Sequence, residues 1–399
     1  MRKLNKTAAC GILAAALAAG TLSGCSKAID GTKTVATVGD EKVTLGLASY
    51  MTRDQQAQTM SYYNMLMSQY GVSGSASNVW DQKGDDGKTV GENSKDSVMK
   101  TINQLYVLKA HAADYDVTIT EDEEKAIKEA AAEFIKDNDE KILKKLAVSE
   151  DDIVTYLELV TIRSKMHDPM TADVDTEVSA NEKDQTRVTI VKVSTEGTEK
   201  DDDGNTIDLT DEEKAQKKDL AQQVLDKVKA SDDVANADMD ALAKEVDDSL
   251  SATAPAFTTA GDTDDTLDEA VQGAALELKD GEVADKVIEG DDGYYVVRLD
   301  KMLDEDATEN KEKTVISERK SDLYDSTLED WVKEEKIKVK DEVWDQIKVT
   351  DSVSFAYKSA DSSDDTESSD TQDSTEDTSS QDNSEDTTTE DSAAEDSAE

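Results

Sequence analysis

The stretch GEVADKVIEGDDGYYVVRLDK, residues 281–301, contains two apolar segments separated by a short acidic turn. Val283, Val287 and Ile288 form the first segment. Residues 294–299 form the second, which is rich in aromatic and β-branched side chains and therefore typical of a strand. Between them, residues 289–293 combine acidic side chains with glycine, which tolerate the tight backbone of a turn. The stretch predicts the closing hairpin of a small domain that contains both helices and strands.

The residues before this hairpin predict the rest of that domain. Residues 187–194 read as a strand, and Pro255 indicates a second, irregular strand nearby. Three segments have helical patterns, namely residues 211–230, 238–246 and 266–278. We therefore expect residues 186–303 to form one unit, in the order strand, helices, strand, helix and two strands.

The preceding residues, 35–185, predict a mostly helical lobe. After a strand pair around a Gly-Asp-Glu turn, helical patterns cover residues 48–70 and 94–114, and two more helices start at Thr120 and Ser149. Thr120 with Glu123 has the spacing of a capping box. The helix at 48–70 is rich in methionine and tyrosine, which fits either a core helix or a soft apolar surface for partners.

Residues after the hairpin return to a helical pattern. We expect a helix over residues 309–339 and expect residues 304–358 to pack back on the first lobe, which makes that lobe discontinuous in sequence. The predicted fold class is therefore α+β. Residues 359–399 hold 16 acidic side chains and no basic or aromatic ones, a composition typical of a disordered tail.

The first residues predict an exported protein. A basic start and a short apolar segment have the pattern of a signal peptide over residues 1–24. This segment ends in Leu22-Ser23-Gly24-Cys25, which resembles a bacterial lipobox, so we expect Cys25 to be acylated and residues 25–34 to form a lipidated tether. The alternative is a plain secretory signal with a chance cysteine.

The composition and the motifs of the chain exclude several classes of protein function. With 93 acidic and 44 basic side chains, the formal net charge is −49, so binding to nucleic acid is excluded because phosphates would be repelled. No zinc-type spacing, phosphate loop or Ser/His/Asp set occurs, so we predict no metal, no cofactor and no nucleophilic catalysis.

The layout resembles the PrsA-type foldases and SurA-like chaperones, extracytoplasmic proteins with a parvulin-type peptidyl-prolyl isomerase domain. The resemblance covers roughly residues 35–345, and its motifs are VATVGDEKVT (35–44), DMDALAKEVDDSLSA (238–252) and ALELKDGEVADKVIEGDDGYYVVRLD (275–300). It implies a chaperone lobe with an inserted parvulin-like domain. It also implies unfolded or partly folded secreted polypeptides as partners, at the extracytoplasmic face of the cell membrane.

The resemblance places a degenerate isomerase cleft in the domain. The family's histidines fall at Thr189 and Tyr295, and its cysteine or aspartate falls near Ser249, with Asp248 beside it. The apolar wall falls at Leu267 and Val271. The only histidines, His111 and His167, precede the domain, so the histidine pair is missing.

Three functions stay open at this point. The first is a membrane-anchored foldase or chaperone without isomerase catalysis. The second is an active peptidyl-prolyl isomerase that works without the histidine pair. The third, from another class, is a ligand-binding lipoprotein. The oligomeric state, monomer or homodimer, is also open.

Overall fold

The computed structural model describes residues 15–17, 29–69, 79–198, 206–260, 267–349 and 355–357. Cys25, nearly all of the expected signal peptide and the whole acidic tail lie outside these ranges. Two short strands near the ends of the chain, β1 (Ala15–Leu17) and β10 (Phe355–Tyr357), pair antiparallel.

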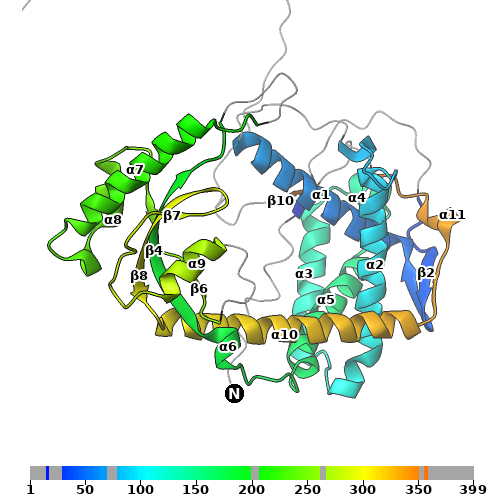
Figure 1. Ribbon diagram of the computed structural model, residues 1–399. Helices are drawn as coiled ribbons and strands as arrows, with labels where there is room; N and C mark the ends of the chain where they lie inside the picture. Colours follow the sequence, from blue (N-terminus) through cyan, green and yellow to red (C-terminus); the bar gives the residue numbers. More distant parts are fainter. Residues whose placement is uncertain are drawn as a thin grey trace, which may run out of the picture. The chain divides into compact units, whose positions relative to one another are not determined.

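The helical lobe is built on a three-stranded sheet and a group of helices (Figure 1). The sheet has the order β3-β2-β9, with β2 (Thr34–Val38), β3 (Glu41–Thr44) and β9 (Ile337–Val339). The helices are α1 (Leu45–Gln69), α2 (Val90–His111), α3 (Glu121–Asp137), α4 (Glu140–Leu146), α5 (Glu150–Met170), α10 (Glu305–Glu334) and α11 (Asp341–Trp344). Two 3-10 turns, η1 (Val79–Asp81) and η2 (Ala112–Tyr115), flank α2.

Capping explains where several of these helices begin. The hydroxyls of Thr120 and Ser149 each accept a hydrogen bond from the backbone N–H three residues later. In return, the carboxylates of Glu123 and Asp152 accept from the N–H groups of Thr120 and Ser149, which completes a capping box at each helix start. Asp152 also accepts a 2.5 Å hydrogen bond from the hydroxyl of Thr44, which ties the start of α5 to β3. A Cβ at Gly46 would lie 2.2 Å from Asp152 Oδ2, so only glycine allows this approach.

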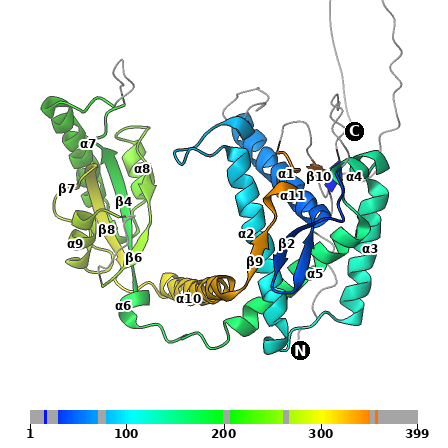
Figure 2. The same cartoon turned by 90° about the vertical axis from the view of Figure 1, so that its right-hand side faces the viewer.

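Elements between residues 305 and 344 pack on the helices and strands of residues 34–170. Strand β9 pairs antiparallel with β2, with Thr37 opposite Lys338 (Figure 2). Helix α10 packs on α2 and α5. The predicted helix over 309–339 is wrong at its end, because α10 stops at Glu334 and residues 337–339 form a strand. Helix α4 was not predicted from the sequence.

The inserted domain has an antiparallel sheet in the order β5-β4-β8-β7, with β6 also pairing β4. Its strands are β4 (Gln185–Ser194), β5 (Ala252–Thr253), β6 (Ala256–Thr258), β7 (Ile288–Glu289) and β8 (Gly293–Lys301). Its helices are α6 (Ala180–Lys183), α7 (Asp211–Lys229), η3 (Val234–Asn236), α8 (Met239–Lys244) and α9 (Glu269–Leu276). The predicted hairpin is β7 and β8, with Ile288 opposite Tyr295.

Two connections join the inserted domain to the helical lobe. The chain enters through residues 171–184 and leaves through α10. Arg319 of α10 donates to the carbonyls of Asp175 and Glu177, at 3.1 and 2.9 Å, and to Glu182 Oε1 at 2.5 Å. The guanidinium of Arg319 therefore joins three residues of the entry segment to α10.

Candidate functional site

The central strands β4 and β8 present two different faces because successive side chains point to opposite sides of a sheet. On one face, Val191 and Val296 pack in a core with α7 and α8. On the other, Val188 and Val297 pack in a core with α9. A candidate cleft must be assigned to one of these faces.

The expected apolar wall and the last expected histidine position lie together on the α9 face. Leu267, Val271 and Tyr295 belong to one buried core, and their exposed fractions are 6%, 0% and 4%. The ring of Tyr295 therefore occupies space among the side chains that the resemblance assigns to the proline seat. Tyr295 is therefore part of the packed core at this position.

Polar partners hold the phenol of Tyr295 at the edge of this core. Its hydroxyl donates to Asp292, which also accepts a 2.5 Å hydrogen bond from Lys192 Nζ. Lys192 lies opposite Tyr295 in the β4–β8 register. Burial, and then the hydrogen bond to Asp292, raises the pKa of Tyr295 above its usual value. Lys192 and then Tyr295 hold the pKa of Asp292 below its usual value.

The turn beside Tyr295 is fixed by Asp268, the N-cap of α9. Asp268 Oδ1 accepts from the N–H of Ala270 and its Oδ2 accepts from the N–H of Asp291, at 2.8 and 2.7 Å. A Cβ at Gly290 would lie 2.3 Å from Asp268 Oδ2 and 2.8 Å from the ring of Tyr295. The turn, the helix start and the tyrosine therefore pack as one unit that requires glycine.

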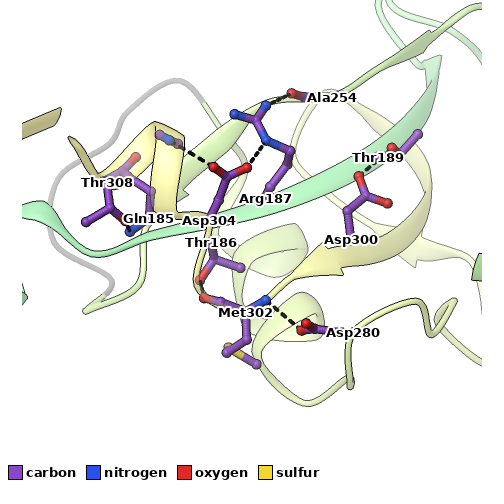
Figure 3. Close-up of polar contacts among 11 residues, drawn as sticks. Gln185, Thr186, Arg187, Thr189, Ala254, Asp280, Asp300, Met302, Asp304 and Thr308 are labelled. Atoms are coloured by element: carbon purple, nitrogen blue, oxygen red, sulfur yellow. Dashed lines mark hydrogen bonds and ion pairs between the residues drawn. The ribbon is translucent and has the colours of Figure 1, made fainter. Parts of the chain in front are cut away.

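Thr189, the expected first-strand position, is not part of this group. It alternates with Val188 and lies on the α7/α8 side, where its hydroxyl donates to Asp300 Oδ2 at 2.6 Å (Figure 3). Arg298 donates from Nε to Asp300 and from Nη1 to the carbonyl of Ala237, at 2.7 and 2.8 Å. Arg298 is only 8% exposed, so this is a buried ionic network that joins the sheet to η3.

Asp248 and Ser249, the other expected polar positions, lie in an exposed turn between α8 and β5. The hydroxyl of Ser249 donates to Asp247 Oδ1 at 2.6 Å, which is a local turn contact. The next residue, Leu250, packs in the α7/α8 core. The structure thus brings together Leu267, Val271 and Tyr295, and it places Thr189, Asp248 and Ser249 elsewhere.

The start of β4 joins the domain to α10 through a second polar group (Figure 3). Arg187 pairs with Asp304, the N-cap of α10, and donates from Nη1 to the carbonyl of Ala254 at 2.8 Å. The N–H of Asp304 donates to the carbonyl of Gln185 at 2.8 Å, and Thr308 accepts from the N–H of Gln185 at 3.0 Å. The first turn of α10 is therefore fixed to the first residues of the domain.

Sequence reasoning missed Lys192 and Asp292, the polar neighbours of Tyr295. A signal was present, because Lys192 interrupts the apolar strand at a position on the same face as Val188 and Ile190. Asp292 lies in the turn, where acidic residues are common for other reasons. Arg298 was missed because the sequence does not reveal a buried charge.

The described ranges hold no group of three or more His, Cys, Asp or Glu side chains arranged to bind a metal ion. In the same part of the chain, we find no helix with the length and apolar character needed to cross a membrane.

Comparison with protein families assigns the inserted domain. Residues 200–313 match the family model of the PPIC-type PPIase domain, Rotamase_2. The chain carries a parvulin-type domain. This PPIC-type domain match runs from residue 200 to residue 313 in α10, and it begins after β4, the strand on which the resemblance places a histidine.

Solved structures similar to this chain include two foldase proteins and one chaperone. The PrsA foldase of Lactococcus lactis is 14% identical, with 78% of this chain and 96% of that chain covered and a TM-score of 0.31. PrsA of Streptococcus pneumoniae is 16% identical, with 66% and 96% covered and a TM-score of 0.30. A SurA-like chaperone of Campylobacter jejuni is 10% identical, with 77% and 99% covered and a TM-score of 0.26. No curated protein sequence matches this chain.

Proposed function

We propose that this protein is a membrane-anchored, extracytoplasmic foldase that binds unfolded or partly folded secreted polypeptides. In this proposal the parvulin-type domain has lost isomerase catalysis. The observation that carries it is the burial of Tyr295 with Leu267 and Val271 in one core. An isomerase needs an open apolar seat for the proline ring, so that the enzyme can lower an amide rotation barrier of about 18–20 kcal/mol.

The missing histidines support the same conclusion. Both histidines of the chain, His111 and His167, lie on helices of the lobe. Beside Tyr295, Asp292 accepts one hydrogen bond from the tyrosine hydroxyl and another from Lys192 Nζ. This arrangement satisfies the buried hydroxyl and stabilises the fold of the domain.

A second candidate is an active peptidyl-prolyl isomerase without the histidine pair. The family match over residues 200–313 favours it, because the matched family is named for this activity. In this case the phenol of Tyr295 would have to move out of its core and hydrogen-bond to the twisting amide. This candidate therefore requires a rearrangement around Gly290 and Asp268.

The anchor is supported by the lipobox-like sequence that ends at Cys25. Acylation at this cysteine would hold the protein at the outer face of the cell membrane. In cells, Cys25→Ser should abolish the incorporation of labelled fatty acid and leave the signal segment uncleaved at this site. Equal incorporation of labelled fatty acid in Cys25→Ser would contradict the anchor.

One pair of assays separates the candidates. Prolyl isomerisation of a chromogenic peptide is measured beside suppression of aggregation of a chemically denatured model protein. Suppression without catalysis is the expected result. Catalysis that disappears in Tyr295→Ala would instead favour the isomerase, and failure in both assays would redirect attention to a ligand-binding lipoprotein.

A further inference from the structure

Helix α1 changes character along its length. Residues of its first half, such as Leu47 and Tyr50, are buried in the core of the lobe. Further along, the side chains of Tyr62 and Met65 are 63% and 62% exposed. The methionine- and tyrosine-rich segment noted in the sequence is therefore part core and part surface. Figure 1 shows the second half of α1 extending past α3 and α5.

The exposed half of α1 is also free of charge. Residues 55–69, of which all but Gln56 and Ala57 are half-buried or exposed, contain no Asp, Glu, Lys or Arg, in a chain in which 34% of residues are charged. An exposed helical surface without charges and with large apolar side chains is typical of an interaction site. Methionine adapts its shape to different partners, and tyrosine adds contact area with a polar tip.

A cavity of about 440 Å³ lies between α1, α2 and α5, within the size range of ligand sites. Val98, Leu105 and Val160, which are almost fully buried, form its apolar lining. Gln55 and Gln58 of α1 also line it. Among its lining residues only Asp54 and Arg163 are charged, so the charges balance.

The cavity and the exposed pair lie on one stripe of α1. Met51, Gln55 and Gln58 line the cavity, and Tyr62 and Met65 follow at spacings of four and three residues. Residues three and four apart share one face of a helix. The stripe from residue 51 to residue 65 is about 21 Å long at 1.5 Å per residue. We call these five residues the α1 stripe.

We propose that the α1 stripe binds an extended apolar segment of a non-native polypeptide, with one side chain of that segment in the cavity. This inference rests on the proposed foldase function and names its client site. The balanced charge of the cavity suits an uncharged segment, which the strongly negative remainder of the chain neither attracts nor repels. Glutamine amides both donate and accept, as the unpaired backbone of an unfolded chain requires. At about 3.3 Å per residue, the stripe accommodates roughly six residues of extended chain.

The test uses the purified full-length protein and a fluorescently labelled, reduced and carboxymethylated α-lactalbumin, which stays unfolded. The variant Tyr62→Asp places a charge on the stripe. Its matched control, Asn64→Asp, adds the same charge at an exposed position of the same helix that is neither three nor four residues from any member of the stripe. Circular dichroism verifies that α1 remains folded in both.

We expect the stripe variant to bind the probe at least about tenfold more weakly and the control to change binding less than about twofold, because the control leaves the apolar contacts intact. A photoreactive benzoylphenylalanine at position 62 should crosslink to the probe. If the original protein binds and the stripe variant binds equally well, the α1 stripe is not the client site and the foldase proposal stands. If the original protein does not bind, the foldase proposal itself fails. If the stripe variant only converts a dimer to a monomer in sedimentation, the stripe is an interface between two copies.

Discussion

The imidazole of His111 stacks on the indole of Trp331, with ring centroids 4.1 Å apart and ring planes 14° apart. His111 ends α2, whereas Trp331 lies on α10, more than 200 residues later in the sequence. The other histidine, His167, lies in the last turn of α5. Its ring centroid is 5.4 Å from the ring centroid of Tyr324, which is also on α10. The chain has no histidine in its parvulin-type domain, and its two histidines instead pack α10 against α2 and α5.

This stacking predicts that Trp331 is important for the stability of the lobe. Trp331→Ala removes contacts with His111 and Tyr115 and should lower the free energy of unfolding by about 2 kcal/mol. Amide hydrogen exchange along α10 should become faster in the variant. Trp331→Phe keeps a stacking ring and serves as the control. Unchanged exchange in Trp331→Ala would show that α10 is held by other contacts.

Tyr295 gives a prediction that separates its hydroxyl from its ring. Tyr295→Phe leaves Asp292 with Lys192 and should destabilise the domain by about 1 kcal/mol. Tyr295→Ala leaves a cavity against Leu267 and Val271 and should cost about 3 kcal/mol or more. The three tryptophans, at positions 80, 331 and 344, lie outside the domain, so hydrogen exchange of β8 amides is the suitable measurement. Equal effects of the two variants would mean that the ring is not packed as described.

The connection between Glu182 and Arg319 predicts a dependence on pH. Hydrogen bonds from the hydroxyl and N–H of Ser179, and then from Arg319, lower the pKa of Glu182 from 4.5 to about 2. A depressed carboxyl pKa stabilises the folded form above the unfolded pKa, and this stabilisation is lost as the pH falls from about 4.5 towards 2. Proteolysis of the entry segment 171–184 should therefore accelerate over this interval.

Glu182→Gln provides the control for this prediction, because glutamine cannot carry the charge. In that variant the cleavage rate of the segment should vary less between pH 4.5 and pH 2, and it should already be raised at neutral pH. An identical pH profile in the two proteins would show that Glu182 does not fasten the segment.

The buried network around Arg298 predicts strong coupling between two residues. Arg298→Ala leaves the half-buried carboxylate of Asp300 without its ionic partner, bonded only to the hydroxyl of Thr189, and should destabilise the domain by about 2 kcal/mol. Replacing both residues, as in Arg298→Met with Asp300→Leu, should recover much of this loss because no unpaired charge remains. Urea unfolding of the two variants checks this. A double variant less stable than Arg298→Ala would show that the network contributes more than the pairing of its charges.

Local patterns predicted the elements whose causes lie in neighbouring residues. The capping box at Thr120 indicated the start of α3, and Ser149 was correctly predicted as the start of another helix, α5. The turn at residues 289–293 indicated the β7–β8 hairpin. The end of α10 could not be predicted in this way. Ile337 and its neighbours leave the helix because they pair with β2, and nothing near them in the sequence indicates that partner.

The candidate site was predictable only in part for a geometric reason. Placing Tyr295 beside Leu267 and Val271 required only the hairpin and the helix pattern. Thr189 depended on the register of a strand, in which a shift of one residue moves a side chain to the opposite face. The residue pointing to the α9 core is Val188, next to the expected position. Lys192 and Asp292 meet only because the β4–β8 register brings them together.

The pairing of β2 with β9 also determines an order of events during synthesis. Residues 34–38 emerge early, and their partners at residues 337–339 emerge only after about 300 further residues have been made. The parvulin-type domain, by contrast, is continuous from β4 to β8 and can form while α10 is still being translated. The lobe therefore lacks β9 until late in synthesis, and until then a nascent copy of this protein exposes part of the unfinished core of the lobe.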